Sequence, residues 1–302
     1  MVLSAQENAA IVYFRAGVDK LRLRAAPDKN AVVLAELKEH TMLRYLNESG
    51  GNMEQLTLRG VQYNKRWYKV AVADDLSKSG WVYGGAVAIS SVFIPENIPF
   101  DAIQEDFLKI SKSNKAEFEK VKAAAPNVFT RDTLAHCPEA GLIRLDYENG
   151  NGRIIRDTID AEFDGEGSIA YEYLGQYESI AQYLIEINGS EFQALQFIDS
   201  RNGKLLETMP FTNNIPVLSP DKKWLASGHG DVYENRGGLQ FLLSDANGVF
   251  PAFTIEQEDA DVTDCYWSQS SGELFFVLDK ISREYGAPPS NLRYYRLKIP
   301  AP

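Results

Sequence analysis

The residues that could carry nucleophilic or metal chemistry are few: three histidines and two cysteines in 302 residues. A zinc hydrolase needs clustered His, Asp or Glu ligands, and the spacing of His40, His136 and His229 matches no such motif. A cysteine peptidase needs a thiolate paired with a histidine, but the adjacent side chains of His136 and Cys137 point in opposite directions in an extended segment. Pairing of Cys137 with His229 stays an alternative, without a peptidase signature around either residue. We therefore predict no catalytic residue, no metal and no cofactor.

One acidic stretch resembles a calcium loop. In DAEFDGEG, acidic side chains occupy alternate positions before a glycine, at Asp160, Glu162 and Asp164. The twelfth position of the loop would need a bidentate glutamate, and it is Tyr171. A solvated acidic turn is therefore expected. The glycine-rich run GHGDVYENRGG at 228–238 is expected to be an exposed loop.

Length and charge limit the classes of protein that remain. With 302 residues and 44% hydrophobic content, the chain is expected to form about two folded domains. Residues 1–99 hold 12 Lys+Arg and 10 Asp+Glu, which leaves 19 against 32 for residues 100–302. This balance argues against a nucleic-acid partner, because phosphates favour a basic face. We expect no transmembrane segment, no secretory signal at the start, and free thiols at both cysteines.

Two prolines, Pro95 and Pro99, divide the chain, since proline disrupts strand pairing. We predict a first β domain at 8–95 and a helical connector at 98–126. In the connector, apolar residues at helical spacing from Phe100 to Leu108 predict one helix, and the capping register of Asn114 with Glu117 predicts a second. An antiparallel β domain is predicted at 128–300.

The predicted β domain contains short apolar runs separated by turn residues, and some of them repeat. LQFIDS and LQFLLSD lie about 44 residues apart, and VLSPDKKWLASG is echoed about 48 residues later by CYWSQSSGELFFV. LSPDKKWLAS resembles the blades of bacterial propeller proteins of the Tol-translocation type. Only about three such units fit, whereas closed propellers normally need at least four blades. An open or truncated blade stack, or a curved antiparallel sheet, satisfies the same pattern.

Alternation governs the strands of the first domain. In LRLR, Leu21 and Leu23 share one face and the two arginines share the other, which is typical of a half-buried strand. In WYKV at 67–70 the two aromatic residues lie on opposite faces, and in GWVYGGAV at 80–87 Trp81 and Tyr83 share a face. We therefore expect at least one row of aromatic side chains to be accessible.

The first domain resembles the bacterial Src-homology-3-like domain, SH3b. The resemblance lies in the order of four elements, LRLRAAP at 21–27, VLAELKEHT at 33–41, WYKV at 67–70 and GWVYGGAV at 80–87. The TLRGVQY segment looks like an insertion in the envelope-protein branch of that family, often found in lipoproteins of Bacteroidetes-like bacteria. The resemblance implies a small SH3-like β-barrel that binds peptides or cell-wall peptidoglycan, and a location in the bacterial periplasm or cell envelope.

These observations favour a mainly β, noncatalytic envelope protein that recognises a peptide-like or peptidoglycan ligand. We expect stacking by Tyr13, Trp67, Trp81 and Tyr83, with Arg22 as the polar anchor. Buried core rings and solvated strand-face arginines are the competing interpretation of the same residues. One alternative function is a structural or assembly protein whose two domains form a scaffold, with another envelope protein as partner. The other is a hydrolase that acts through Cys137.

Overall fold

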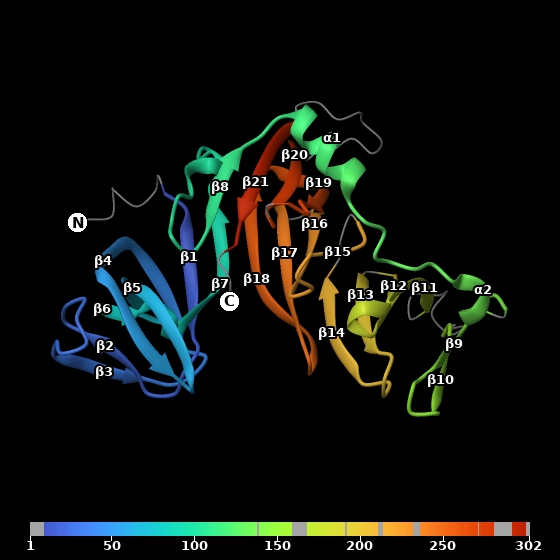
Figure 1. Cartoon of the computed structure of the whole chain (residues 1–302), viewed down its shortest axis with the longest axis horizontal. Helices are drawn as coiled ribbons and strands as arrows, with labels where there is room; N and C mark the ends of the chain where they lie inside the picture. Colours follow the sequence, from blue (N-terminus) through green and yellow to red (C-terminus); the bar gives the residue numbers. More distant parts are fainter. Residues whose placement is uncertain are drawn as a thin grey trace. The chain divides into compact units, whose positions relative to one another are not determined.

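The chain divides into two compact units. In the computed structural model, the first unit comprises residues 1–99 with 253–256, and the second comprises residues 100–252 with 257–302. Strands dominate both units, so the fold is mainly β (Figure 1). The structure describes residues 9–137, 139–158, 168–190, 192–210, 214–231, 236–270, 272–280 and 292–299.

Seven antiparallel strands make up the first unit. They are β1 (Ile11–Ala16), β2 (Leu21–Arg24), β3 (Val33–Leu37), β4 (Met42–Leu58), β5 (Val61–Val72), β6 (Asp75–Tyr83) and β7 (Val87–Ile94). Their order within the unit is β7-β1-β4-β5-β6-β2-β3 (Figure 1). Among the described residues, no ladder joins β7 to β3, so the sheet of this unit is not closed by pairing.

The core of the first unit is aromatic. The Phe14 ring stacks on Tyr68 at 5.3 Å between centroids and meets the edge of Tyr45 at 5.7 Å. All three side chains are buried, because strict alternation in β1, β4 and β5 directs them to the same face. The predicted half-buried strand at LRLR is confirmed in part: Leu21 and Leu23 are buried, but so is Arg24.

Strands β4 and β5 continue beyond the core as a two-stranded ribbon, defined here as residues 46–66. Its tip is the pair Arg59 and Gly60, both at positive φ (49° and 81°), as a tight hairpin turn requires. Gly50 and Gly51 lie where the ribbon passes the aromatic strands. A Cβ on Gly50 would come within 2.7 Å of the Trp81 ring, so only glycine lets the backbone lie this close.

The second unit contains three groups of four antiparallel strands and one hairpin. The first group is β11 (Ile169–Tyr177), β12 (Gln182–Gly189), β13 (Gln193–Asp199) and β14 (Leu205–Pro210). The second group is β15 (Val217–Leu218), β16 (Trp224–Asp231), β17 (Arg236–Asp245) and β18 (Gly248–Glu258), and residues 253–256 of β18 belong to the first unit. The third group is β19 (Ala260–Trp267), β20 (Leu274–Lys280), β21 (Arg293–Lys298) and β8 (Lys109–Lys112). The hairpin is β9 (Leu142–Asp146) with β10 (Gly152–Arg156).

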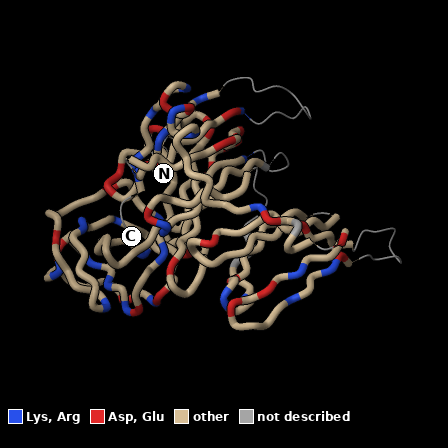
Figure 2. The backbone as a smooth tube through the Cα atoms, turned by 45° about the vertical axis from the view of Figure 1, so that its right-hand side comes forward, with Lys and Arg blue, Asp and Glu red and all other residues tan. Residues whose placement is uncertain are grey.

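Apolar side chains join the first two groups. Tyr177, Leu184 and Phe197 of the first group pack with Leu225 and Leu242 of the second, and all are buried. The third group lies against the second, because β19 contacts β16. Lys, Arg, Asp and Glu positions are spread along the tube rather than gathered in one block (Figure 2).

The predicted connector is only half helical. The second predicted helix is confirmed as α1 (Lys115–Ala124), where the Asn114 side chain accepts the Glu117 backbone N–H at 3.0 Å. The first predicted helix is wrong: Phe100–Ala102 forms a 3-10 turn, and the chain then enters β8. Phe100 packs on Phe276 at 5.5 Å between ring centroids, so tertiary packing overrides the local helical spacing.

Two hairpins of the second unit share a serine-based turn. Between β15 and β16, the Ser219 backbone N–H donates to the Trp224 carbonyl at 2.8 Å. Between β19 and β20, the Ser268 backbone N–H donates to the Glu273 carbonyl, also at 2.8 Å. These turns occupy the same place in VLSPDKKWLASG and CYWSQSSGELFFV, so the two repeated stretches form hairpins of the same build.

Candidate functional site

A cavity of about 490 Å³ lies in the first unit between the ribbon and the segment that enters β2. The ribbon contributes 56–59, and the segment around β2 contributes 18–22 and Arg24. Lys29, Trp67, Tyr83 and Ala86 complete the lining. This volume falls within the range of roughly 300 to 1,000 Å³ that is usual for ligand sites.

Hydrogen bonds fasten the ribbon to two rings of the cavity wall. The Tyr83 hydroxyl lies 2.6 Å from the Glu54 carbonyl oxygen and 2.9 Å from that of Tyr63, and it accepts the Lys65 backbone N–H at 3.2 Å. The Trp67 Nε1–H donates to the Glu54 carboxylate at 2.9 Å. Burial raises the pKa of Tyr83, so this hydroxyl stays protonated and remains a donor at neutral pH.

Tyr83→Phe should therefore loosen the ribbon. We expect a loss of about 1 to 2 kcal/mol in the free energy of unfolding of the first unit, because a donor to two partly buried carbonyls disappears. Amide hydrogen exchange should accelerate over the ribbon more than over β1. Tyr13→Phe is the matched control, since the Tyr13 hydroxyl has no hydrogen-bond partner among the described residues. Equal exchange in both variants would mean that Tyr83 does not fasten the ribbon.

Five cationic side chains line this cavity: Lys20, Arg22, Arg24, Lys29 and Arg59. Asp19 is the one acidic residue in its lining. The Arg24 guanidinium lies 6.0 Å from the centre of the Trp67 ring, and its Nη1 donates to the Ala31 carbonyl at 2.7 Å. The cavity therefore combines a basic wall with the apolar side chains of Leu21, Leu56 and Leu58.

Three of these cations have carboxylate partners just outside the lining. Arg22 lies 3.6 Å from Glu36, Lys29 lies 3.2 Å from Glu54, and Arg59 lies 2.9 Å from Glu39. Exposed pairs such as Arg22 with Glu36 are worth about 0 to 1 kcal/mol, so a bound anion can replace the partner at little cost. Within the part of the chain that the structure describes, Lys20 and Arg24 have no carboxylate partner.

The structure brings three of the five predicted binding residues to this cavity. Arg22, Trp67 and Tyr83 line it, whereas Tyr13 and Trp81 do not. Tyr13 is half-buried on β1, and Trp81 is buried beneath Gly50 and the Lys69 side chain. Sequence reasoning missed Lys29 and the ribbon residues, because their contribution depends on how the ribbon folds back.

The expected row of accessible aromatic side chains is wrong for the central rings. Trp67 is 3% exposed, Tyr83 4% and Trp81 9%, and Tyr68 is buried on the opposite face of β5. Alternation does separate Trp67 from Tyr68, as expected. The ribbon then covers the face that alternation alone leaves open to water.

His136 and the two cysteines lie in packed surroundings in the described part of the chain. His136 packs against Tyr173 at 4.6 Å between ring centroids, and its Nδ1 lies 3.0 Å from the Arg144 carbonyl oxygen. Both cysteines are free, and Cys265 is fully buried. Burial raises the pKa of the Cys137 thiol, and it raises the pKa of Cys265 to about 12. Neither thiol is activated as a nucleophile requires.

Thiol alkylation should distinguish the two cysteines. Because a raised pKa keeps the thiol protonated below that pKa, iodoacetamide at pH 8 should modify half-buried Cys137 slowly and leave Cys265 intact. In denaturant both should react at similar rates. Mass spectrometry of tryptic peptides gives the readout. Rapid modification of Cys265 in the folded protein would contradict the buried position.

Other expected features lie partly outside the described residues. Asp160, Glu162 and Asp164 of the acidic stretch are outside them, as is Glu234 of the glycine-rich run. Residues 228–231 and 236–238 of that run pair as strands rather than forming a loop. The described residues contain no cluster of His, Cys, Asp and Glu suited to a metal ion.

In the described ranges, no helix has the length and apolar character needed to cross a membrane.

Comparison of the chain with known protein families, with curated proteins and with solved structures found no match.

Proposed function

We propose that the chain is a noncatalytic binding protein of the bacterial cell envelope whose first unit is an SH3b-like module. Its ligand is a peptide or peptidoglycan stem that carries a carboxylate, and the ligand lies in the cavity between the ribbon and β2. The observation that carries this proposal is the convergence of five cationic side chains on one cavity with apolar walls. The rings form part of the wall instead of an exposed stacking surface.

The chemistry of the cavity suits such a ligand. A guanidinium binds a carboxylate through two parallel N–H donors, and charge-assisted hydrogen bonds are about twice as strong as neutral ones. Arg22 and Lys20 are the proposed anchors, because Arg22 is exposed and Lys20 has no carboxylate partner among the described residues. Leu21, Leu56 and Leu58 provide contacts for methyl groups of the ligand.

The second unit is proposed to be an open stack of three propeller-type blades that offers a second interaction surface. Two four-stranded antiparallel sheets, the run of paired strands from β15 to β18, and two hairpins of the same build support this assignment. In the third group, β8 comes from the start of the second unit and β21 from near its end. The two strands pair, so the first and last strands of this unit lie in one sheet.

A sedimentation assay with purified peptidoglycan tests the binding function. Lys20→Gln with Arg22→Gln should lower the affinity at least roughly tenfold, because even one lost charge-assisted bond to a carboxylate is worth about 1.5 to 3 kcal/mol. The matched control is Arg15→Gln with Lys78→Gln, which removes the same charge from exposed positions outside the cavity.

The two double variants distinguish ligand binding in the cavity from nonspecific electrostatic attraction to peptidoglycan. Full binding by the control and weak binding by the cavity variant is the expected result. Equal loss in both would indicate nonspecific electrostatics, and no sedimentation of the wild type would favour the alternative of an assembly protein. Circular dichroism establishes that each variant is folded.

A further inference from the structure

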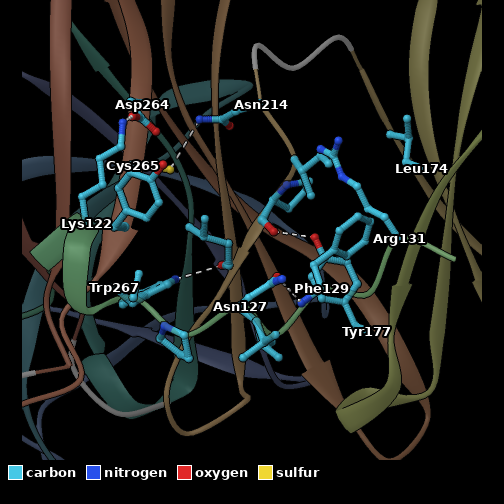
Figure 3. A pocket seen from close by; sticks show the side chains of 18 of the residues that line it. Lys122, Asn127, Phe129, Arg131, Leu174, Tyr177, Asn214, Asp264, Cys265 and Trp267 are labelled. Atoms are coloured by element: carbon cyan, nitrogen blue, oxygen red, sulfur yellow. Dashed lines mark hydrogen bonds and ion pairs between the residues drawn. The ribbon is translucent and has the colours of Figure 1, made fainter.

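A second and larger cavity, of about 1220 Å³, lies wholly within the second unit. The first strand of each four-stranded group contributes to it: Leu174 and Tyr177 from β11, Val217 and Leu218 from β15, and residues 264–267 from β19 (Figure 3). The cavity therefore forms where the three groups approach one another. Residues 125–129 and Arg131, which follow α1, form a further part of its wall.

This wall segment is fixed in place. Thr130 and Gln176 exchange both backbone hydrogen bonds, each at 2.9 Å, and the Phe129 ring packs on Tyr177 at 4.7 Å between centroids. Gly175 allows this approach, since a Cβ there would overlap the Thr130 carbonyl oxygen. The next residue, Arg131, is consequently held at the cavity by the backbone that precedes it.

Four charged side chains line the cavity: Lys122, Arg131, Glu186 and Asp264. Lys122 and Asp264 form an ion pair at 2.7 Å, and the Glu186 carboxylate accepts a hydrogen bond from the Gln193 side chain. No partner of the Arg131 guanidinium is found within the described ranges. Its side chain extends from the wall segment toward the middle of the cavity (Figure 3). Among the described residues, Arg131 is thus the cation of the lining that has no carboxylate partner, and its guanidinium carries five N–H donors.

Three of the four aromatic rings in the wall, those of Tyr177, Tyr266 and Trp267, are not free to stack on a sugar. Trp267 is buried, and its Nε1–H donates to the Val217 carbonyl at 2.9 Å. Tyr266 lies between Phe118, at 5.8 Å, and the Lys122 ammonium, at 5.3 Å. Tyr177 is likewise buried. Because a carbohydrate site normally offers an open aromatic face, this arrangement disfavours a saccharide.

Aliphatic side chains of the lining remain partly accessible. Val128 is 36% exposed, and Leu174 and Ile215 are half-buried, so each can contact an apolar side chain of a ligand. A volume above roughly 1,000 Å³ exceeds that of most small-molecule sites. A single guanidinium beside aliphatic contacts, in a cavity of this size, matches a carboxylate followed by apolar residues.

We propose that this cavity is a separate binding site for the C-terminal end of a peptide. The peptide carboxylate binds the Arg131 guanidinium, and aliphatic side chains of its last residues contact Val128, Leu174 and Ile215. The site is independent of the cavity in the first unit, because the two share no residue.

Isothermal titration of the whole chain with a matched pair of peptides tests this site. The probes are acetyl-Ala-Leu-Leu with a free carboxylate and the same peptide as its C-terminal amide. We expect saturable binding of the acid at one site and affinity roughly tenfold or more lower for the amide, given the strength of charge-assisted bonds. Arg131→Gln should weaken the acid to the level of the amide and leave the amide unchanged.

Arg144→Gln is the matched control, since Arg144 is exposed on β9 outside the cavity. Equal affinity for acid and amide, or unchanged affinity in Arg131→Gln, would overturn the proposal, as would binding of chitotriose in place of either peptide. The Lys20→Gln, Arg22→Gln variant should retain the peptide bound at Arg131. Loss of peptide binding in this double variant would assign the peptide to the first unit and overturn the second site. Failure of the wild-type protein to sediment with peptidoglycan would contradict only the proposed function.

Discussion

Phe14→Ala is expected to lower the free energy of unfolding of the first unit by about 3 to 5 kcal/mol. Phe14 is 1% exposed and lies between Tyr45 and Tyr68, so removing its ring leaves a cavity that neighbouring aromatic side chains cannot fill by small shifts. A loss of this size is a large part of the stability of a small domain, which is typically 5 to 15 kcal/mol.

Amide hydrogen exchange in increasing denaturant measures this effect for each unit separately. Amides of β1 and β5 should exchange at much lower denaturant in Phe14→Ala. Arg15→Ala is the control, because its side chain is exposed on the same strand and its loss should change stability by less than about 0.5 kcal/mol. Similar behaviour of the two variants would refute the aromatic core.

Gly228→Ala is expected to destabilise the second unit by about 1 to 3 kcal/mol, the range found for overpacking. A Cβ on Gly228 of β16 would overlap the carbonyl oxygen of Val262 on β19. Because backbone atoms cannot rotate away as a side chain can, the second and third groups would have to separate.

Gly17→Ala in the first unit is the control variant for Gly228→Ala. Its Cβ would lie 3.4 Å from the nearest atom, an ordinary van der Waals distance, so the change should be small or slightly stabilising. Hydrogen exchange of β16 and β19 reports the outcome. Unchanged protection of these strands in Gly228→Ala would show that the two groups do not approach as closely as the structure has them.

Several strands of the second unit can be predicted from local sequence, because their residues favour the extended conformation. Runs such as AQYLIEI and ELFFVL are apolar and β-branched or aromatic, and polar turns bound them, so they form β12 and β20 as predicted. The turn at DSRNGK likewise closes β13 onto β14, with Gly203 at φ 75°. Local propensity and tertiary packing agree in these segments.

The connector shows where local pattern fails. Helical spacing of Phe100, Ile103 and Phe107 predicts a helix, yet these residues are buried by contacts distant in sequence. Strand β8 pairs with β21 across almost the whole second unit. Such pairing leaves no signal in a window of ten or twenty residues, so the sequence alone could not predict it.

The candidate site was predictable only in part. Alternation in LRLR indicates that Arg22 and Arg24 lie on one side of the strand, whereas Lys20 precedes β2 at a turn with a φ of 56°. The burial of Trp67 by the ribbon was not predicted, although Arg59 and Gly60, which lie between two alternating runs, are typical of a hairpin turn. A hairpin can be recognised from such a turn, but the face onto which it folds cannot.

Nuclear magnetic resonance of the ¹⁵N-labelled chain, titrated with a soluble peptidoglycan stem peptide, tests the central claim most directly. The resonances of the Trp67 indole N–H and of the backbone amides of Lys20, Arg22 and Arg59 should shift together and saturate, because all four residues line one cavity. Saturable shifts confined to residues outside that cavity, or no shifts at all, would contradict it.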